Sequence, residues 1–176
     1  MQTSIYLAGP DVFLPDALAV GAAKQAICAG YGIEGLFPLS EDEPGDAYAI
    51  YRECQHMMRQ ADIGVFNLTP FRGPSADPGT VLELGYMAAL GKPVFGYSAT
   101  TAPLKARLGA LDERDGKLWG QDGCFVEDFG LADNLMLEGV IADSGGCFIA
   151  IDEAGIAAMA AFDALIEEVA QRAGSL

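Results

Sequence analysis

Two acidic residues stand close together at the start of a predicted helix. Asp77 lies in a turn rich in Pro and Gly, residues 70–80, and Glu83 follows between the apolar residues Leu82 and Leu84. A carboxylate buried alone is costly unless it is paired or used. Two carboxylates in a cleft can break a glycosidic bond, one as nucleophile and the other as proton donor. An Asp before a Pro is also an ordinary helix N-cap, so both interpretations of Asp77 stay open.

The other reactive side chains give no sign of metal or redox chemistry. The cysteines are scattered without a CxxC pair, and the one histidine, His56, cannot complete a zinc site with them at any familiar spacing. We therefore expect reduced thiols, no metal and no organic cofactor. The four cysteines are Cys28, Cys54, Cys124 and Cys147.

Charge and hydropathy argue against several classes of partner. The formal net charge is −15, from 25 acidic and 10 basic residues, and no stretch gathers Lys and Arg into a basic patch. Such a chain offers little to a phosphate backbone or an anionic membrane. The N-terminus lacks signal-peptide features, and no run approaches the roughly 20 apolar residues of a membrane span. We expect a cytoplasmic protein that binds neither nucleic acid nor membrane.

The first hundred residues alternate short apolar runs with helical patterns, which is typical of βαβ units around a parallel sheet. With 51% hydrophobic residues, the chain is expected to form one α/β domain over residues 1–176. Residues 100–130 lack clean periodicity beyond a short helix at 104–108. Predicted strands cover 4–8, 35–39, 62–68 and 93–97, and predicted helices cover 16–29, 46–60, 80–90 and 151–173.

Two turns are expected to form the site. In an open parallel sheet, ligands bind beyond the carboxyl ends of the strands. The first predicted strand runs into Gly9, Asp11 and Phe13, and the third runs into the turn that carries Asp77. We therefore expect these turns to meet at one edge of the sheet.

Three segments of the chain resemble the nucleoside 2-deoxyribosyltransferase family. They are IYLAGPDVF at 5–13, ADIGVFNLTPFRGPSADPGTVLELGYMAALGKPV at 61–94 and FGLADNLMLEG at 129–139. The middle segment is the most specific, because it combines PFRG, an Asp and GTxxELGY. The resemblance implies a flavodoxin-like, doubly wound sheet with helices on both faces. It also implies an enzyme of nucleotide salvage that exchanges 2-deoxyribosyl between deoxynucleosides and free nucleobases.

The same resemblance implies a role for each residue of the site. Glu83 would attack the anomeric carbon, Asp77 would contact the base and protonate it as it leaves, and Tyr6 would orient Glu83. Further residues would bind substrate, namely Gly9, Asp11 and Phe13 on the base side, together with Gly79.

A neighbouring subunit is expected to complete the site. Family members supply an Asn from a second subunit, and Asn134 in the third segment matches it. The resemblance therefore implies a homo-oligomer. Helix capping by Asp133 or Asn134 is the alternative that the residues leave open.

The chain departs from the family at the sugar. Where relatives place an Asn or Asp to hold the sugar hydroxyls, this chain has Cys54, and a thiol is a weaker hydrogen-bond partner. Asp42 is expected to offer a further carboxylate to the sugar. Two alternative functions follow: hydrolysis of deoxynucleosides or their 5′-monophosphates, and nucleoside binding without turnover.

Overall fold

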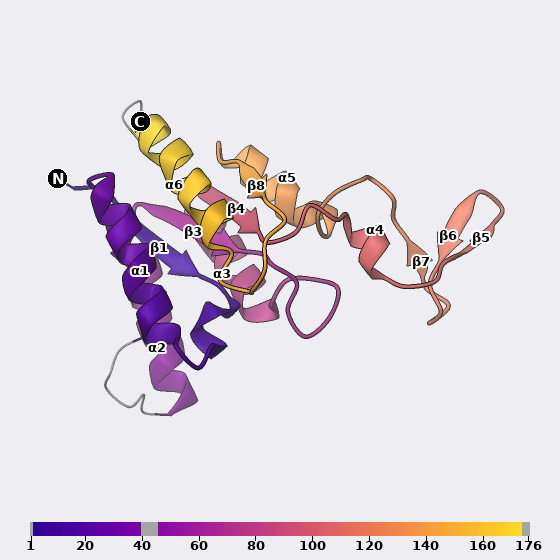
Figure 1. The fold of residues 1–176 in the computed structure, drawn as a ribbon, viewed down its shortest axis with the longest axis horizontal. Helices are drawn as coiled ribbons and strands as arrows, with labels where there is room; N and C mark the ends of the chain where they lie inside the picture. The colour runs from indigo at the N-terminus through magenta and orange to yellow at the C-terminus, as the bar shows by residue number, and fades with distance from the viewer. Residues whose placement is uncertain (1, 40–45, 174–176) are drawn as a thin grey trace.

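The computed structural model describes residues 2–39 and 46–173, and its centre is a parallel sheet (Figure 1). The strand order is β2-β1-β3-β4-β8, with every neighbouring pair parallel. This order is flavodoxin-like and places the topological switch point between β1 and β3, where such sheets bind ligands. The five strands are β1 (Ser4–Ala8), β2 (Glu34–Leu36), β3 (Ile63–Asn67), β4 (Val94–Ser98) and β8 (Phe148–Ala150).

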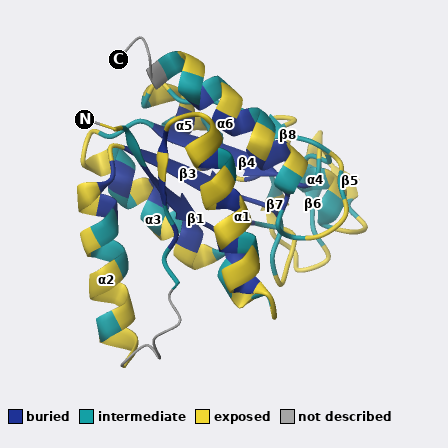
Figure 2. Ribbon diagram, turned by 60° about the vertical axis from the view of Figure 1, so that its left-hand side comes forward, coloured by how far each residue is buried: buried dark blue, intermediate teal, exposed yellow. Residues whose placement is uncertain are grey.

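Helices cover both faces of the sheet, as the sequence predicts for a doubly wound fold. Figure 2 shows buried strands between helices whose outer sides are exposed. One layer holds α1 (Ala17–Gly30) and α6 (Met159–Ala173), and the other holds α2 (Ala47–Gln60), α3 (Pro78–Ala89) and α5 (Leu135–Asp143).

Successive residues of each strand face opposite layers. In β1, Ile5 and Leu7 join the apolar cluster beneath α1 and α6, whereas Tyr6 and Ala8 join the cluster beneath α2, α3 and α5. This alternation directs the Tyr6 side chain toward α2 and α3.

A small antiparallel sheet projects from the body and was not predicted (Figure 1). It follows the short helix α4 (Leu104–Arg107), which the sequence predicts at 104–108. The sheet lies within residues 108–130. Its strands are β5 (Asp112–Arg114), β6 (Lys117–Trp119) and β7 (Phe125–Val126).

The predicted second strand and closing helix have different bounds in the structure. The second strand pairs over Glu34–Leu36 rather than 35–39, and Pro38 has no N–H to continue the ladder. The closing helix begins at Met159 rather than 151. Before it, Ala158 has a φ of 49°, and the Glu153 carboxylate accepts the backbone N–H groups of residues 160 and 161.

The sequence also missed α5 and β8, which occupy most of the apolar stretch 135–150. β8 has only three residues, and short strands carry little periodicity. Among the described residues, no helix is both long enough and apolar enough to cross a membrane.

Candidate active site

Glu83 and Tyr6 meet through a hydrogen bond between α3 and β1. The Tyr6 side chain is fully buried, and its hydroxyl donates to Glu83 Oε1 at 2.9 Å. Glu83 itself is half-buried in the middle of α3. The carboxylate thus lies at the boundary between the core and solvent, held by a rigid strand.

Burial raises the pKa of Glu83 to about 7, from its ordinary value of 4.5. Desolvation is the largest cause, the Tyr6 hydrogen bond opposes it, and the negative charge of Asp77 raises the pKa further. A carboxyl group with this pKa titrates near neutrality. Its ionised form can act as a nucleophile and its protonated form as an acid.

Cys54, on α2, lies close enough to Tyr6 and Glu83 to influence the pKa of each of them. Burial raises the pKa of Cys54, so its thiol stays neutral and is a poor nucleophile. Burial likewise raises the pKa of Tyr6 well above its usual range, which keeps the hydroxyl a donor. The sequence-predicted Tyr6, Glu83 and Cys54 therefore form one cluster.

Asp77 is the N-cap of α3, as the capping interpretation predicts. Its Oδ2 accepts the Thr80 backbone N–H at 3.0 Å, and its charge still acts on Glu83. A Cβ at Gly79 would lie 2.9 Å from Asp77 Oδ2, so a side chain there would press on this carboxylate. The cap and Gly79 together fix the Asp77 side chain at the start of the helix that carries Glu83.

Asp11, which the sequence analysis placed on the base side of the pocket, is buried inside the fold. It is 2% exposed, forms an ion pair with the fully buried Lys24, and accepts a hydrogen bond from Asn67 Nδ2. Lys24 Nζ also donates to the Tyr97 hydroxyl at 2.7 Å. The turn after β1 forms the short helix η1 (Pro10–Phe13), and Asp11 joins this turn to α1 and β3. Its carboxylate therefore supports the turn from within the fold.

The turns after β1 and β3 do meet, as expected. The Phe13 ring stacks on the Phe71 ring with 5.2 Å between centroids, and the Arg72 guanidinium lies 4.6 Å from the Phe71 centroid. Phe13 remains 55% exposed. A Cβ at Gly9 would lie 2.5 Å from Asn67 Cβ, so the turn needs glycine to pack against the end of β3.

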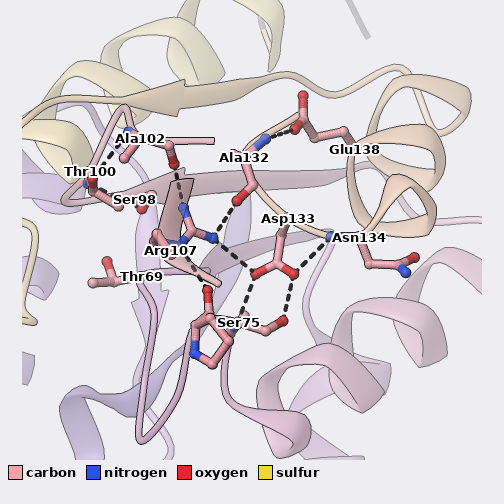
Figure 3. Close-up of polar contacts among 12 residues, drawn as sticks. Thr69, Ser75, Ser98, Thr100, Ala102, Arg107, Ala132, Asp133, Asn134 and Glu138 are labelled. Atoms are coloured by element: carbon pink, nitrogen blue, oxygen red, sulfur yellow. Dashed lines mark hydrogen bonds and ion pairs between the residues drawn. The ribbon is translucent and has the colours of Figure 1, made fainter. Parts of the chain in front are cut away.

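Asn134 is the N-cap of α5, and its Oδ1 accepts the Met136 backbone N–H at 3.0 Å. Its side-chain amide extends away from the buried carboxylate of Asp133 (Figure 3). The capping alternative therefore holds for Asn134, and its place in a neighbouring subunit's site stays a prediction. Asp42 lies outside the described residues.

Sequence reasoning did not identify three residues that support the turns of the site, namely Lys24, Asn67 and Arg107. Lys24 had a signal, since it is the one cation in the apolar helix ALAVGAAKQAICAG. Asn67 and Arg107 had none, because their partners are distant in the sequence. Within residues 2–39 and 46–173, no group of three His, Cys, Asp or Glu side chains is arranged to hold a metal ion.

The chain is similar in sequence to a protein family and to a curated protein, and in sequence and structure to a solved structure. The sequence model of the family described as nucleoside 2-deoxyribosyltransferase matches residues 5–136. An uncharacterised protein of Schizosaccharomyces pombe is 35% identical over 97% of this chain and 90% of its own length. A 2-deoxyribosyltransferase structure from Leishmania mexicana is 33% identical, with a TM-score of 0.68 over 94% of this chain and 97% of that one.

A CMP N-glycosidase of Clostridium botulinum has a similar fold. Its TM-score is 0.51 at 11% identity, and the match covers 99% of this chain and 100% of that chain.

Proposed function

The chain belongs to the nucleoside 2-deoxyribosyltransferase family, and from this premise we propose that it exchanges the bases of 2′-deoxynucleosides. The reaction is a double displacement that uses Glu83 as nucleophile, Asp77 as the acid and base, and Tyr6 as the group that orients Glu83. Deoxynucleosides and free nucleobases are its substrates, and nucleotide salvage is its setting.

In the first half-reaction, an oxygen of the ionised Glu83 carboxylate attacks the anomeric carbon. The bond from this carbon to the base nitrogen breaks, and a proton passes from Asp77 to the departing base. In the second half-reaction, a nitrogen of the acceptor base attacks the same carbon. The ester bond to Glu83 then breaks, and the acceptor's proton returns to Asp77. Atoms and charges balance over the two steps.

The observation that carries this proposal is the half-buried Glu83 carboxylate. Its Oε1 accepts a hydrogen bond from the Tyr6 hydroxyl at 2.9 Å, and the charge of Asp77 is close enough to raise its pKa. Burial keeps the nucleophile poorly solvated and therefore reactive, while the hydrogen bond preserves a population of the ionised form. Shielding from water also favours transfer to a base over hydrolysis of the ester.

The substrate-binding part of the proposal uses the rest of the site. Phe13 offers an exposed aromatic ring to the base, next to the close-packed Gly9, and Gly79 leaves room beside Asp77. Cys54 and Asp42 bind the sugar. Asp11 takes part only by holding the turn that carries Phe13.

We also propose a homo-oligomer in which Asn134 reaches the site of a neighbouring copy. The exposed Met136 beside it, at 67% exposure, supports a contact surface at this end of α5. The proposed location is the cytoplasm, which suits the free thiols of Cys28, Cys54, Cys124 and Cys147.

Base exchange is the direct test. The purified protein is incubated with deoxyadenosine and either hypoxanthine or cytosine, and all bases and nucleosides are followed by chromatography. New deoxyinosine or deoxycytidine, formed in proportion to adenine, supports a transferase. Adenine with free deoxyribose and no new nucleoside would make the protein a hydrolase, and binding without turnover would make it a sensor. The Glu83→Gln variant should lose all turnover.

A further inference from the structure

Arg107 joins three separate segments near the start of α3. Its Nε donates to the Pro74 carbonyl at 2.7 Å, and its two terminal nitrogens donate to the carbonyls of Ala102 and Ala132. Arg107 Nη2 also forms an ion pair with Asp133 Oδ2 at 3.7 Å. One guanidinium thus ties the turn after β3 to the segment after β4 and to the start of α5 (Figure 3).

Asp133, the ion-pair partner of Arg107, binds the same turn. It is 5% exposed, and its two oxygens accept the Ser75 hydroxyl and, at 2.9 Å, the Ala76 backbone N–H. Ala76 directly precedes Asp77. Asp133 also accepts the backbone N–H of Asn134 at 2.8 Å. A buried carboxylate with this many partners has a fixed geometry and cannot itself reach a ligand.

We propose that Arg107 and Asp133 are positioning residues that hold Asp77 in place for protonation of the leaving base. Within residues 74–76, Arg107 donates a hydrogen bond to the first carbonyl. Asp133 accepts hydrogen bonds from the Ser75 hydroxyl and the Ala76 N–H. This inference rests on the proposed function, because it concerns the step that Asp77 performs there.

The turn needs such support. It carries several Pro and Gly residues, and Arg72 within it has a φ of 55°, in the left-handed region that non-glycine residues rarely adopt. The Asp77 cap fixes the side chain to α3. The backbone that leads into it has one hydrogen bond within the turn, from the Phe71 N–H to the Ser75 carbonyl, and is otherwise held by Arg107 and Asp133. A displacement of about 1 Å at a catalytic group can cost about 100-fold in rate.

A pair of donors can separate proton donation from general loss of structure. Adenine leaves deoxyadenosine with a proton from the enzyme. The base of 7-methyl-2′-deoxyguanosine already carries a positive charge and leaves without one. A defect in the placement of Asp77 should therefore slow the first donor much more than the second. Any loss from Glu83, from folding or from Asn134 affects both donors and cancels in the ratio of their rates of base release.

The experiment measures the single-turnover rate of base release, without an acceptor base, for both donors in the wild type and in Arg107→Met, Asp133→Asn and Ser75→Ala. The ratio of these rates, deoxyadenosine to 7-methyl-2′-deoxyguanosine, should fall about 10-fold or more in Arg107→Met and Asp133→Asn, since a general acid contributes about 100-fold or more. Ser75→Ala removes one hydrogen bond and leaves the rest, so its ratio should fall less. The concentration of 7-methyl-2′-deoxyguanosine that gives half of the maximal rate should change little.

Matched controls lie on the same segment. Lys105 and Asp128 form an exposed ion pair, with 43% and 42% of their side chains accessible. Lys105→Met also removes one positive charge and Asp128→Asn also neutralises one carboxylate, and both should keep the wild-type ratio. Circular dichroism and thermal unfolding report whether each variant folds. Ser75→Ala tests the inference if the two larger changes prevent folding.

Equal losses on both donors in the folded variants would overturn the positioning role while leaving the proposed function intact. Release of both bases by Glu83→Gln at the wild-type rate would overturn the proposed function, and the positioning role with it. A ratio that falls in the test variants and holds in the controls would support both.

Discussion

Replacing Glu83 by Gln should make the protein more stable at alkaline pH while abolishing its activity. The pKa of Glu83 is about 7 in the folded protein, against an ordinary 4.5, mainly because burial disfavours the charged carboxylate. The folded state therefore binds this proton more tightly than the unfolded state does. Stability from the protonated group is fully present below about pH 4.5 and is lost as the pH rises through 7.

The magnitude follows from the size of this difference. A change of one in pKa corresponds to about 1.4 kcal/mol, so ionising Glu83 in the folded protein costs up to about 3 kcal/mol. Glu83 is only half-buried, and solvent screening reduces the expected cost to about 1–2 kcal/mol. Gln keeps an acceptor for the Tyr6 hydroxyl and has no charge to bury.

The assay is urea unfolding of the wild type and Glu83→Gln at pH 5 and pH 8. The free energy of unfolding of Glu83→Gln, relative to wild type, should rise by about 1–2 kcal/mol between the two pH values. Loss of hydrogen-bond strength in the variant adds an offset that does not depend on pH. The control is Glu167→Gln on the exposed side of α6. A difference that stays constant with pH, or that falls, would refute the reasoning.

Three further predictions concern the groups around this carboxylate and the turn beside it. Tyr6→Phe removes the hydrogen bond that lowers the pKa of Glu83, so the acid limb of kcat/KM against pH should move above 7 and kcat should fall about 10-fold; an unmoved limb would contradict this. Lys24→Met leaves the Asp11 carboxylate buried without its cation and should cost about 3–5 kcal/mol in urea unfolding, whereas the double variant Lys24→Met with Asp11→Asn should lose clearly less. Cys54→Asn supplies an amide to the sugar and should lower the KM for deoxyadenosine about 2- to 10-fold in steady-state kinetics; an unchanged KM would remove Cys54 from the sugar site.

The sheet could be predicted where the strands are long and apolar. β1, β3 and β4 each bury all or nearly all of their residues, which gives near-continuous apolar runs that the sequence displays. β8 has three residues, all half-buried, and it stays in the sheet through its pairing with β4. The start of α6 was also hidden, because its capping carboxylate comes from Glu153 in the preceding connection.

Some features of the candidate site could be predicted from local sequence, and others depend on contacts between distant residues. The position of Tyr6 opposite α2 and α3 follows from strand alternation, and the capping role of Asp77 follows from the Asp-Pro pair. The burial of Asp11 depends on Lys24 and Asn67, which approach it from two other elements. The Ser75 hydroxyl donates a hydrogen bond to Asp133, which lies 58 residues further along the sequence, and no local sequence pattern predicts such a contact.

Covalent capture of the sugar on Glu83 tests the central claim most directly. The protein is mixed with deoxyadenosine in the absence of an acceptor base, quenched in acid, digested and examined by mass spectrometry. We expect one deoxyribosyl group on the peptide that contains Glu83, and its removal when cytosine is added before the quench. Adenine release with the sugar on another residue, or base exchange that persists in Glu83→Gln, would contradict the account.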